Sequence, residues 1–160
     1  MPSPTVVHQS DVLQLATWSR LFINRWRTAA APKLLDTVLR EQLAFIDSFE
    51  DRRIAVLTTL EDTSGLMPTG EARKKAEQIA KTTRDFQILQ AQVVLGDGFV
   101  AATFRALLTG ITLAIRAPYP TKVFKSEAAA LPWIAEQMRK AGFDTDTGEL
   151  IEAVDGLQWG

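Results

Sequence analysis

Hydrophobic and polar positions follow two different periods along this chain, and the changes between them divide it into strands and helices. Residues 12–18 and 20–27 are short apolar runs, and in the second run Leu21 lies on one face and Phe22 on the other. Apolar residues on both faces are typical of strands that are covered on both sides. Only Ser19 separates the two runs, so we expect a tight hairpin.

The next stretch changes to a helical period. Pro32 suits the first turn of a helix, and apolar residues then recur every three or four positions, which predicts an amphipathic helix. These residues are Leu35, Val38, Leu39, Leu43, Ile46 and Phe49. Residues 54–60 are rich in Val, Ile, Leu and Thr and predict a buried central strand. Residues 70–85 favour a second helix with a weak apolar stripe and a basic outer face.

The second half of the chain repeats this alternation. A strand is predicted at residues 91–95, an apolar helix at 99–115, a short strand at 121–124, and a helix at 126–140 that begins with a capping serine. Pro132 lies inside this last helix, where it would either kink the helix or mark its true first turn.

Strands that alternate with helices of this length call for right-handed crossovers and a parallel sheet. We therefore predict an α/β fold with one domain over residues 11–142. Its mostly parallel sheet would have about five strands with an antiparallel edge hairpin, together with about four helices and a further helix in the C-terminal tail. Residues 1–10 are predicted to be a flexible lead, and residues 143–160 an acidic amphipathic tail.

Composition narrows the classes of function. The chain has 160 residues, of which 46% are hydrophobic and 23% are charged, and its net charge is −1. This balance gives no overall electrostatic attraction to nucleic acid or to an anionic membrane. Cysteine is absent, which excludes disulfides, thiolate metal sites and cysteine nucleophiles.

The sequence gives no sign of a membrane segment. The longest apolar run, residues 106–115, is shorter than the roughly 20 residues that a membrane-spanning helix needs. Residues 1–10 lack the basic start and the apolar centre of a signal peptide. We therefore expect a cytoplasmic protein.

No catalytic or metal-binding pattern stands out. His8 is the only histidine, so neither a Ser-His-Asp triad in the core nor a zinc site can be built. Asp144 and Asp146 have the spacing of a calcium loop, but Gly148 occupies the next ligand position. We expect no cofactor and no metal.

Two further stretches resemble ligand-binding motifs but are explained more simply by the structure that they are predicted to form. Gly96-Asp97-Gly98 lacks the lysine of a phosphate-binding loop and indicates a tight turn between a strand and a helix. Arg25-Trp26-Arg27 could stack on nucleic acid, but without a basic surplus it is more typical of a strand with charged ends. We therefore expect no nucleic-acid partner.

Two stretches carry a resemblance to a known family. The strand at 54–60 is followed by Asp62-Thr63-Ser64-Gly65-Leu66, and the segment from Phe99 continues through APYPTKVFKSEAAALPWI. In both, the chain resembles the STAS family, named for sulfate transporters and anti-sigma-factor antagonists, and its stand-alone bacterial relatives. Over residues 12–140 the resemblance implies the same order of strands and helices and a regulatory module that binds a protein partner.

The resemblance also implies a switch at Ser64. In STAS regulators a D-S-S-G-L motif follows a central strand, and phosphorylation of its second serine changes partner binding. By position that serine is Ser64, where a phosphate would add about −1.5 to −2 charges and repel an acidic partner. However, Thr69-Gly70-Glu71 is the better helix start, which would leave Ser64 in a loop. Residues 62–65 also fit a simple turn, which is the interpretation we favour.

Two functions fit such a module. The first is non-enzymatic protein interaction or regulation, with a protein partner or with a second copy of the chain in a homodimer. The alternative is a carrier of an apolar small molecule or lipid, in a cavity lined by residues 99–115 and Trp133. A filled core is the simpler expectation for those apolar residues. In neither function does the chain act as an enzyme.

The C-terminal tail is predicted to dock through an apolar face. From Asp144 it has five acids and no Lys or Arg, so the rest of the chain carries +4. Four apolar residues share one face of a helix predicted over 147–158. They are Leu150, Ile151, Val154 and Leu157. We expect this face to pack in an apolar groove of this domain or of a neighbouring subunit. Trp159 would fix its end, and its acids would lie near Arg73, Lys74 or other basic residues.

Overall fold

A computed structural model describes residues 3–28, 30–61 and 70–159 as strands and helices in alternation. The strands are β1 (Thr5–Gln9), β2 (Leu13–Trp18), β3 (Leu21–Trp26), β4 (Ile54–Leu60), β5 (Gln87–Val94) and β6 (Thr121–Phe124). The α-helices are α1 (Pro32–Asp47), α2 (Gly70–Thr83), α3 (Phe99–Ile115), α4 (Glu127–Lys140) and α5 (Thr147–Asp155), and a short 3₁₀ turn, η1 (Arg84–Phe86), follows α2.

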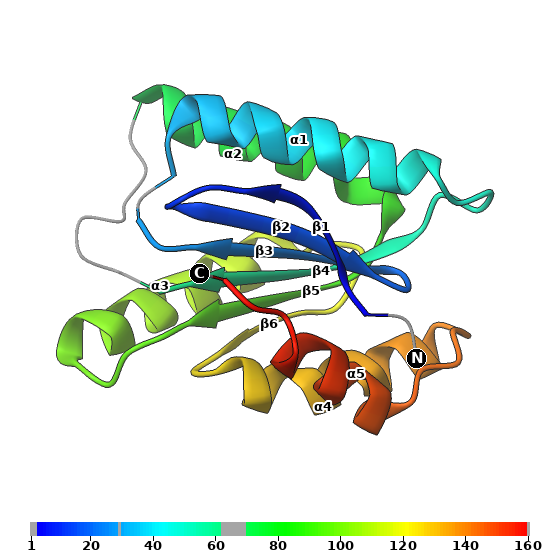
Figure 1. Ribbon diagram of the computed structural model, residues 1–160. Coiled ribbons are helices and arrows are strands. Elements are labelled where there is room, and N and C mark those ends of the chain that lie inside the picture. Colours follow the sequence, from blue (N-terminus) through cyan, green and yellow to red (C-terminus); the bar gives the residue numbers. More distant parts are fainter. Residues whose placement is uncertain (1–2, 29, 62–69, 160) are drawn as a thin grey trace.

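The six strands form one sheet in the order β1-β2-β3-β4-β5-β6. The pairs β1–β2 and β2–β3 are antiparallel, and the pairs from β3 to β6 are parallel. Helices α1 and α2 cover one face of the sheet, and α4 and α5 cover the other (Figure 1). This arrangement confirms the predicted α/β fold with an antiparallel edge.

The β2–β3 hairpin forms as its sequence predicts. Trp18 pairs with Leu21, so Ser19 and Arg20 make the turn, and Ser19 has a φ of +52°. Leu21 belongs to the core beneath α4 and α5, and Phe22 belongs to the core beneath α1 and α2. The strand is therefore covered on both faces, because successive side chains alternate between them.

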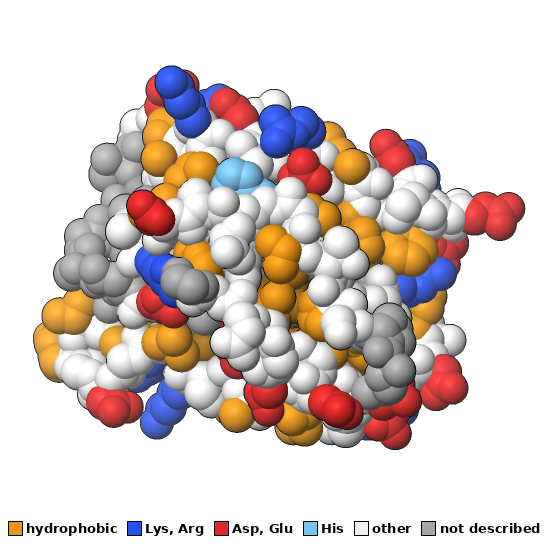
Figure 2. Space-filling view, in the orientation of Figure 1, with side chains coloured by type: hydrophobic (Ala, Val, Ile, Leu, Met, Phe, Trp, Pro, Cys, Tyr) orange, Lys and Arg blue, Asp and Glu red, His pale blue; other side chains and the backbone are white. Residues whose placement is uncertain are grey.

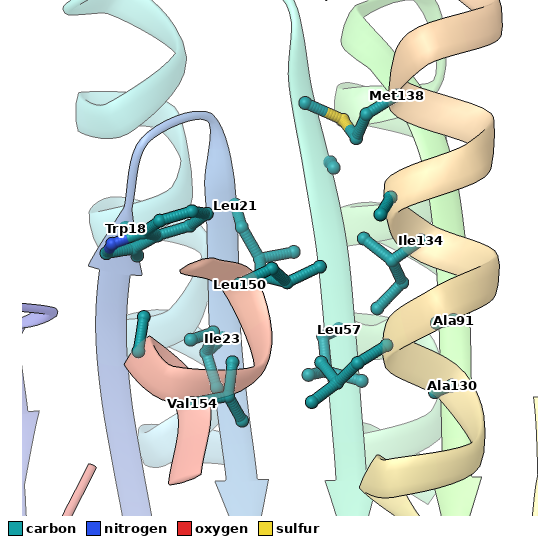
Figure 3. Close-up of a cluster of buried hydrophobic side chains, with 14 of the residues drawn as sticks. Trp18, Leu21, Ile23, Leu57, Ala91, Ala130, Ile134, Met138, Leu150 and Val154 are labelled. Carbon is teal, nitrogen blue, oxygen red and sulfur yellow. The ribbon is translucent and has the colours of Figure 1, made fainter. Parts of the chain in front are cut away.

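Side chains pack into a separate apolar cluster on each face of the sheet. The larger cluster joins Ile23 of β3 and Leu57 of β4 to Ile134 of α4 and to Leu150 and Val154 of α5 (Figure 3). Residues 143–159, the described part of the predicted tail, thus contribute to the core of the same domain. The smaller cluster lies beneath α1 and α2.

Helix ends explain two further features of the sequence. The Ser126 hydroxyl accepts a hydrogen bond from the Ala129 N–H at 3.1 Å and caps α4. The Asp146 carboxylate accepts one from the Glu149 N–H at 2.9 Å and caps α5. Asp146 therefore acts as an N-cap, which is a common role for Asp at a helix start.

Two expectations need correction, and one open alternative is decided. Residues 1–10 do not form a flexible lead throughout, because Thr5–Gln9 pair with β2 as an edge strand. Strand β5 begins at Gln87 and not at residue 91, since its polar side chains hide the alternation. Helix α4 starts at Glu127, so Pro132 lies within the helix and does not mark its first turn.

Across residues 3–28, 30–61 and 70–159, none of the helices combines the length and the hydrophobicity required to cross a membrane.

Candidate functional site

A pocket of about 270 Å³, which we call the α3 pocket, lies between the sheet and helices α1, α2 and α3. Its floor comes from β3, β4 and β5, and its walls come from the three helices. Most of its lining side chains are apolar. They are Trp26, Ala30, Leu35, Val38, Val56, Leu60, Ala76, Ile79, Ala80, Phe104 and Leu108. None of the described residues that line it is charged, so the pocket suits an uncharged occupant.

Asn24 is part of the scaffold of this pocket. Its Nδ2 donates to the Leu57 carbonyl at 3.2 Å and to Thr58 Oγ1 at 3.0 Å, and its Oδ1 accepts from Trp26 Nε1 at 3.0 Å. These bonds satisfy the buried amide and hold the Trp26 ring against the pocket wall. A satisfied amide of this kind stabilises the fold and leaves no group for a ligand.

Two glutamines of the lining, one on the α1 wall and one on the β5 floor, differ from Asn24. Gln42 of α1 is only 2% exposed and makes no hydrogen bond within the described part of the chain. Gln87 of β5 donates through Nε2 to Thr83 Oγ1 at 3.0 Å, but its buried Oε1 has no partner among the described residues. Since buried polar groups are normally hydrogen-bonded, these two amides are the unusual feature of the pocket.

Helix α3 closes one side of the pocket with little burial of its own. Phe104 and Leu108 line the pocket, whereas Ala101 is the only residue of the helix that is fully buried. Its other large apolar side chains are exposed: Phe99 86%, Val100 59%, Leu107 43%, Ile111 42%, Leu113 73% and Ile115 61%. Hydrophobic atoms reach the surface at the lower left of Figure 2, where Figure 1 places the start of α3. Exposed apolar patches of this kind mark interaction sites.

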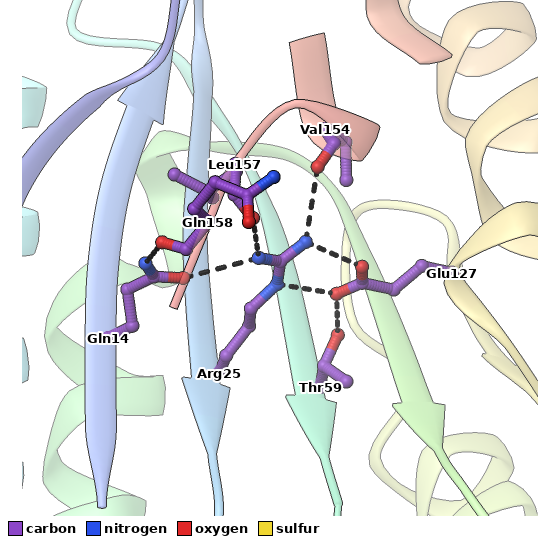
Figure 4. A network of polar contacts seen from close by, with 7 residues as sticks. All are labelled: Gln14, Arg25, Thr59, Glu127, Val154, Leu157 and Gln158. Carbon is purple, nitrogen blue, oxygen red and sulfur yellow. Dashed lines mark hydrogen bonds and ion pairs between the residues drawn. The ribbon is translucent and has the colours of Figure 1, made fainter. Parts of the chain in front are cut away.

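A polar network lies at the carboxyl end of the parallel strands, on the α4–α5 side (Figure 4). Arg25 Nη2 and Nε contact the two carboxylate oxygens of Glu127 at 2.7 and 3.0 Å. The Thr59 hydroxyl donates to the same carboxylate at 2.6 Å. Arg25 also donates to the Leu157 and Val154 carbonyls at 2.9 and 3.3 Å. The network joins β3, β4, α4 and the C-terminal segment.

A second depression, of about 350 Å³, lies beside this network. The Arg27 guanidinium lies 3.8 Å from the centre of the Trp159 ring and 3.5 Å from the Glu61 carboxylate. Carboxyl ends of parallel strands are the usual position of ligand sites in α/β folds. Here, however, the charged side chains pair with one another, so the geometry favours a structural role.

Among the described residues, three groups have a shifted pKa, and each shift has a local cause outside the α3 pocket. A hydrogen bond from Arg20 holds the pKa of Asp51 below its usual value. A hydrogen bond to Asp36 raises the pKa of Lys75. Burial raises the pKa of Tyr119, whose hydroxyl lies 3.5 Å from Gln90 Oε1. Tyr119 therefore stays a neutral hydrogen-bonding group near the pocket floor.

The predicted tail residues lie within the chain's own core. Leu150, Val154 and Leu157 are buried, and Ile151 packs at the edge of the same cluster. The Trp159 indole N–H donates to the Ser10 carbonyl at 2.9 Å and fixes the end of the segment, as expected. The helix is shorter than predicted, because it ends at Asp155.

The remaining predicted residues are not brought together. Arg73 and Lys74 belong to α2, on the face of the sheet opposite α5, and Arg73 pairs with Glu77 of its own helix. The expectation that the tail acids lie near them is therefore wrong: the apolar face of α5 decides where it docks. Ser64 lies outside the described residues, so its phosphorylation stays a prediction.

The sequence misplaced one lining residue and missed others. Trp133 packs on Phe124 with ring centres 5.4 Å apart, on the α4 side, and does not line the α3 pocket. Gln42 was missed, although it falls in helical register with Leu35 and Val38 on the buried face of α1. A polar residue inside an apolar stripe is the signal that could have revealed it.

The described residues contain no cluster of three or more His, Asp or Glu side chains that could hold a metal ion. What the α3 pocket can do chemically is to enclose an apolar molecule and offer it amide hydrogen bonds. Comparison with known proteins adds no identity: no protein-family model matches the chain, and no curated protein matches its sequence.

Proposed function

We propose that this protein is a non-enzymatic binding module of STAS-like type that takes up an apolar small molecule in the α3 pocket. The observation that carries the proposal is the uncharged, mainly apolar lining of a pocket between the sheet and α3. Its volume of about 270 Å³ is close to the lower end of ligand pockets, which is about 300 Å³.

The weak burial of α3 supplies a route of entry. A helix that buries Ala101 alone and exposes Phe99 and Leu113 is held to the sheet by few apolar contacts. Such elements open locally at a low free-energy cost, while the rest of the domain stays folded. A ligand can therefore reach the pocket when α3 moves away from the sheet.

Binding of a neutral fluorophore, N-phenylnaphthylamine, tests the proposal. We expect saturable binding at one site. Ala76→Phe places a ring in the α3 pocket and should lower affinity roughly tenfold or more, because overfilling a packed site costs about 1–3 kcal/mol. Ala129→Phe, at an exposed position of α4, is the matched control and should bind as the wild type does. Binding that does not saturate, or that Ala76→Phe leaves unchanged, would contradict the proposal.

A second candidate function is self-association through the exposed face of α3. The observation in its favour is the exposure of Leu113 and Ile115, at 73% and 61%, because a second copy of the chain would cover such a face. Native mass spectrometry should then show a homodimer that Leu113→Glu converts to a monomer. A monomer in the wild-type protein at micromolar concentration would end this candidate.

A further inference from the structure

The hydrogen-bonding groups of the α3 pocket narrow the chemistry of its ligand. This inference rests on the proposed function, since it concerns the same pocket. It begins with Gln42, which is 2% exposed and lines the pocket without a hydrogen-bond partner among the described residues. Helical spacing places it on the face of α1 that carries Leu35 and Val38, so its amide is directed toward the sheet and the pocket.

Gln87 contributes an acceptor whose orientation is fixed by its neighbours. The Thr83 hydroxyl donates to the Ile79 carbonyl at 2.7 Å. Because a hydroxyl has only one hydrogen to give, Thr83 Oγ1 can only accept from Gln87, and it lies 3.0 Å from Gln87 Nε2. Gln87 Oε1 is therefore the end of the amide that remains unbonded, buried at the pocket lining.

The other polar groups of the lining are partly engaged. Asn24 and Thr58 bond to each other at 3.0 Å, and Gln90 Oε1 is 3.5 Å from the Tyr119 hydroxyl. The side-chain amide N–H groups of Gln90 make no hydrogen bond within the described residues and can add a donor to the pocket. Gln87 Oε1 is the buried acceptor of the lining that lacks a partner among the described residues, and Gln42 offers both donors and an acceptor.

The ligand must match the hydrogen-bonding groups of the pocket, and it must also match the absence of charge among the described lining residues. None of the described lining residues carries a charge, so a carboxylate, phosphate or ammonium group would lose its hydration without an ion pair. Gln87 Oε1 requires a donor, which a carbonyl or an ether cannot supply. A hydroxyl satisfies both conditions, because it donates to Gln87 and can also bond to the Gln42 amide.

We infer that the α3 pocket binds a neutral, apolar molecule that carries a hydroxyl group, and that Gln42 and Gln87 recognise the hydroxyl. The apolar body of the ligand lies against side chains such as Val38, Val56 and Phe104. The class includes long-chain alcohols and excludes fatty acids in their ionised form.

Three probes of equal chain length test this inference: decanol, decanoate and decane. Each is titrated against bound N-phenylnaphthylamine at pH 8. We expect decanol to displace the fluorophore with an affinity roughly tenfold higher than that of either other probe, as one or two added hydrogen bonds predict. Gln87→Leu and Gln42→Leu should each remove most of this preference and leave decane binding unchanged.

The matched control is Gln78→Leu, at an exposed position of α2, which should keep the preference for decanol. Gln42→Leu should fold with an unchanged or higher melting temperature, since it removes an unpaired buried amide. If Gln42→Leu fails to fold, the preference of Gln87→Leu for decanol alone decides whether the inference holds.

The outcomes separate the two proposals. If none of the probes displaces the fluorophore, the proposed function fails. If decane or decanoate binds as well as decanol, or if neither glutamine variant changes the preference, the pocket binds apolar molecules but the hydroxyl inference is overturned.

Discussion

Arg25 shows how one side chain joins distant parts of the chain. Its planar guanidinium contacts both oxygens of Glu127 and also reaches the Leu157 and Val154 carbonyls. Arginine alone offers five donors in such a fixed plane. The residue looks like a candidate nucleic-acid contact in the sequence, but in the fold all of its partners belong to the protein.

Substitution of Arg25 tests this structural role. Arg25→Ala should lower the free energy of unfolding by about 3–5 kcal/mol, because it leaves the Glu127 carboxylate partly buried without its ion pair. Arg25→Lys should recover only part of the loss, since an ammonium group cannot reach Glu127 and both carbonyls at once. Urea denaturation measures both changes.

Arg40, which is 69% exposed, provides the control. Arg40→Ala should change stability by no more than about 0.5 kcal/mol. Equal changes in the free energy of unfolding at Arg25 and Arg40 would show that the Arg25 network does not stabilise the fold more than an exposed arginine does.

At the scale of elements, apolar periodicity predicted most of the fold. Helix α1 and strand β4 fall where their sequences predict them, because α1 buries one apolar face and β4 is an apolar run buried on both faces of the sheet. Strand β1 was missed because its residues Thr5–Gln9 are mainly exposed, so it pairs through backbone hydrogen bonds and leaves little pattern in the sequence. The start of β5 was missed for a related reason, since Gln87 and Gln90 face a pocket.

The candidate site was less predictable than the fold. The sequence offered a cavity lined by residues 99–115 and Trp133 only as an alternative to a filled core, and it did not indicate which face of the sheet would hold such a cavity. Gln42 of α1 and Gln87 of β5 come to line one pocket only when the chain folds. This proximity is a feature of the tertiary structure, and the periodicity of apolar residues within a single helix or strand cannot predict it.

Helix α5 provides a test of how the C-terminal segment is held. Leu150 is 1% exposed and Ile151 lies at the edge of the cluster. Leu150→Ala should therefore cost about 3 kcal/mol of stability, within the range for buried leucines. Ile151→Ala should cost about 1 kcal/mol, because less of its surface is buried. Thermal and urea unfolding measure the difference, and equal losses at the two positions would contradict the observed docking.

At the scale of the whole molecule, the two faces of the sheet are built differently. The α4–α5 face is a continuous apolar core from Trp18 to Leu157. The opposite face has a smaller core and keeps a pocket beside α3. The two faces therefore differ in the size of the apolar cluster that the described residues form on each.

The order of the strands in the sheet has a consequence for how the chain folds during its synthesis. Neighbouring strands of the sheet are also neighbours in sequence, so pairing can proceed in order as the chain leaves the ribosome. The first strands, however, also bond to the C-terminal segment: the Gln14 amide donates to the Gln158 carbonyl, and the Ser10 carbonyl accepts from Trp159. These bonds can form only after the last residues have been synthesised.

About 65 residues separate the end of β5 at Val94 from Trp159. At 5–20 residues per second, roughly 3 to 13 s pass before the ribosome completes them. During that time the apolar face later covered by α4 and α5 is open to solvent, so the nascent chain offers chaperones a binding surface that the finished protein no longer has.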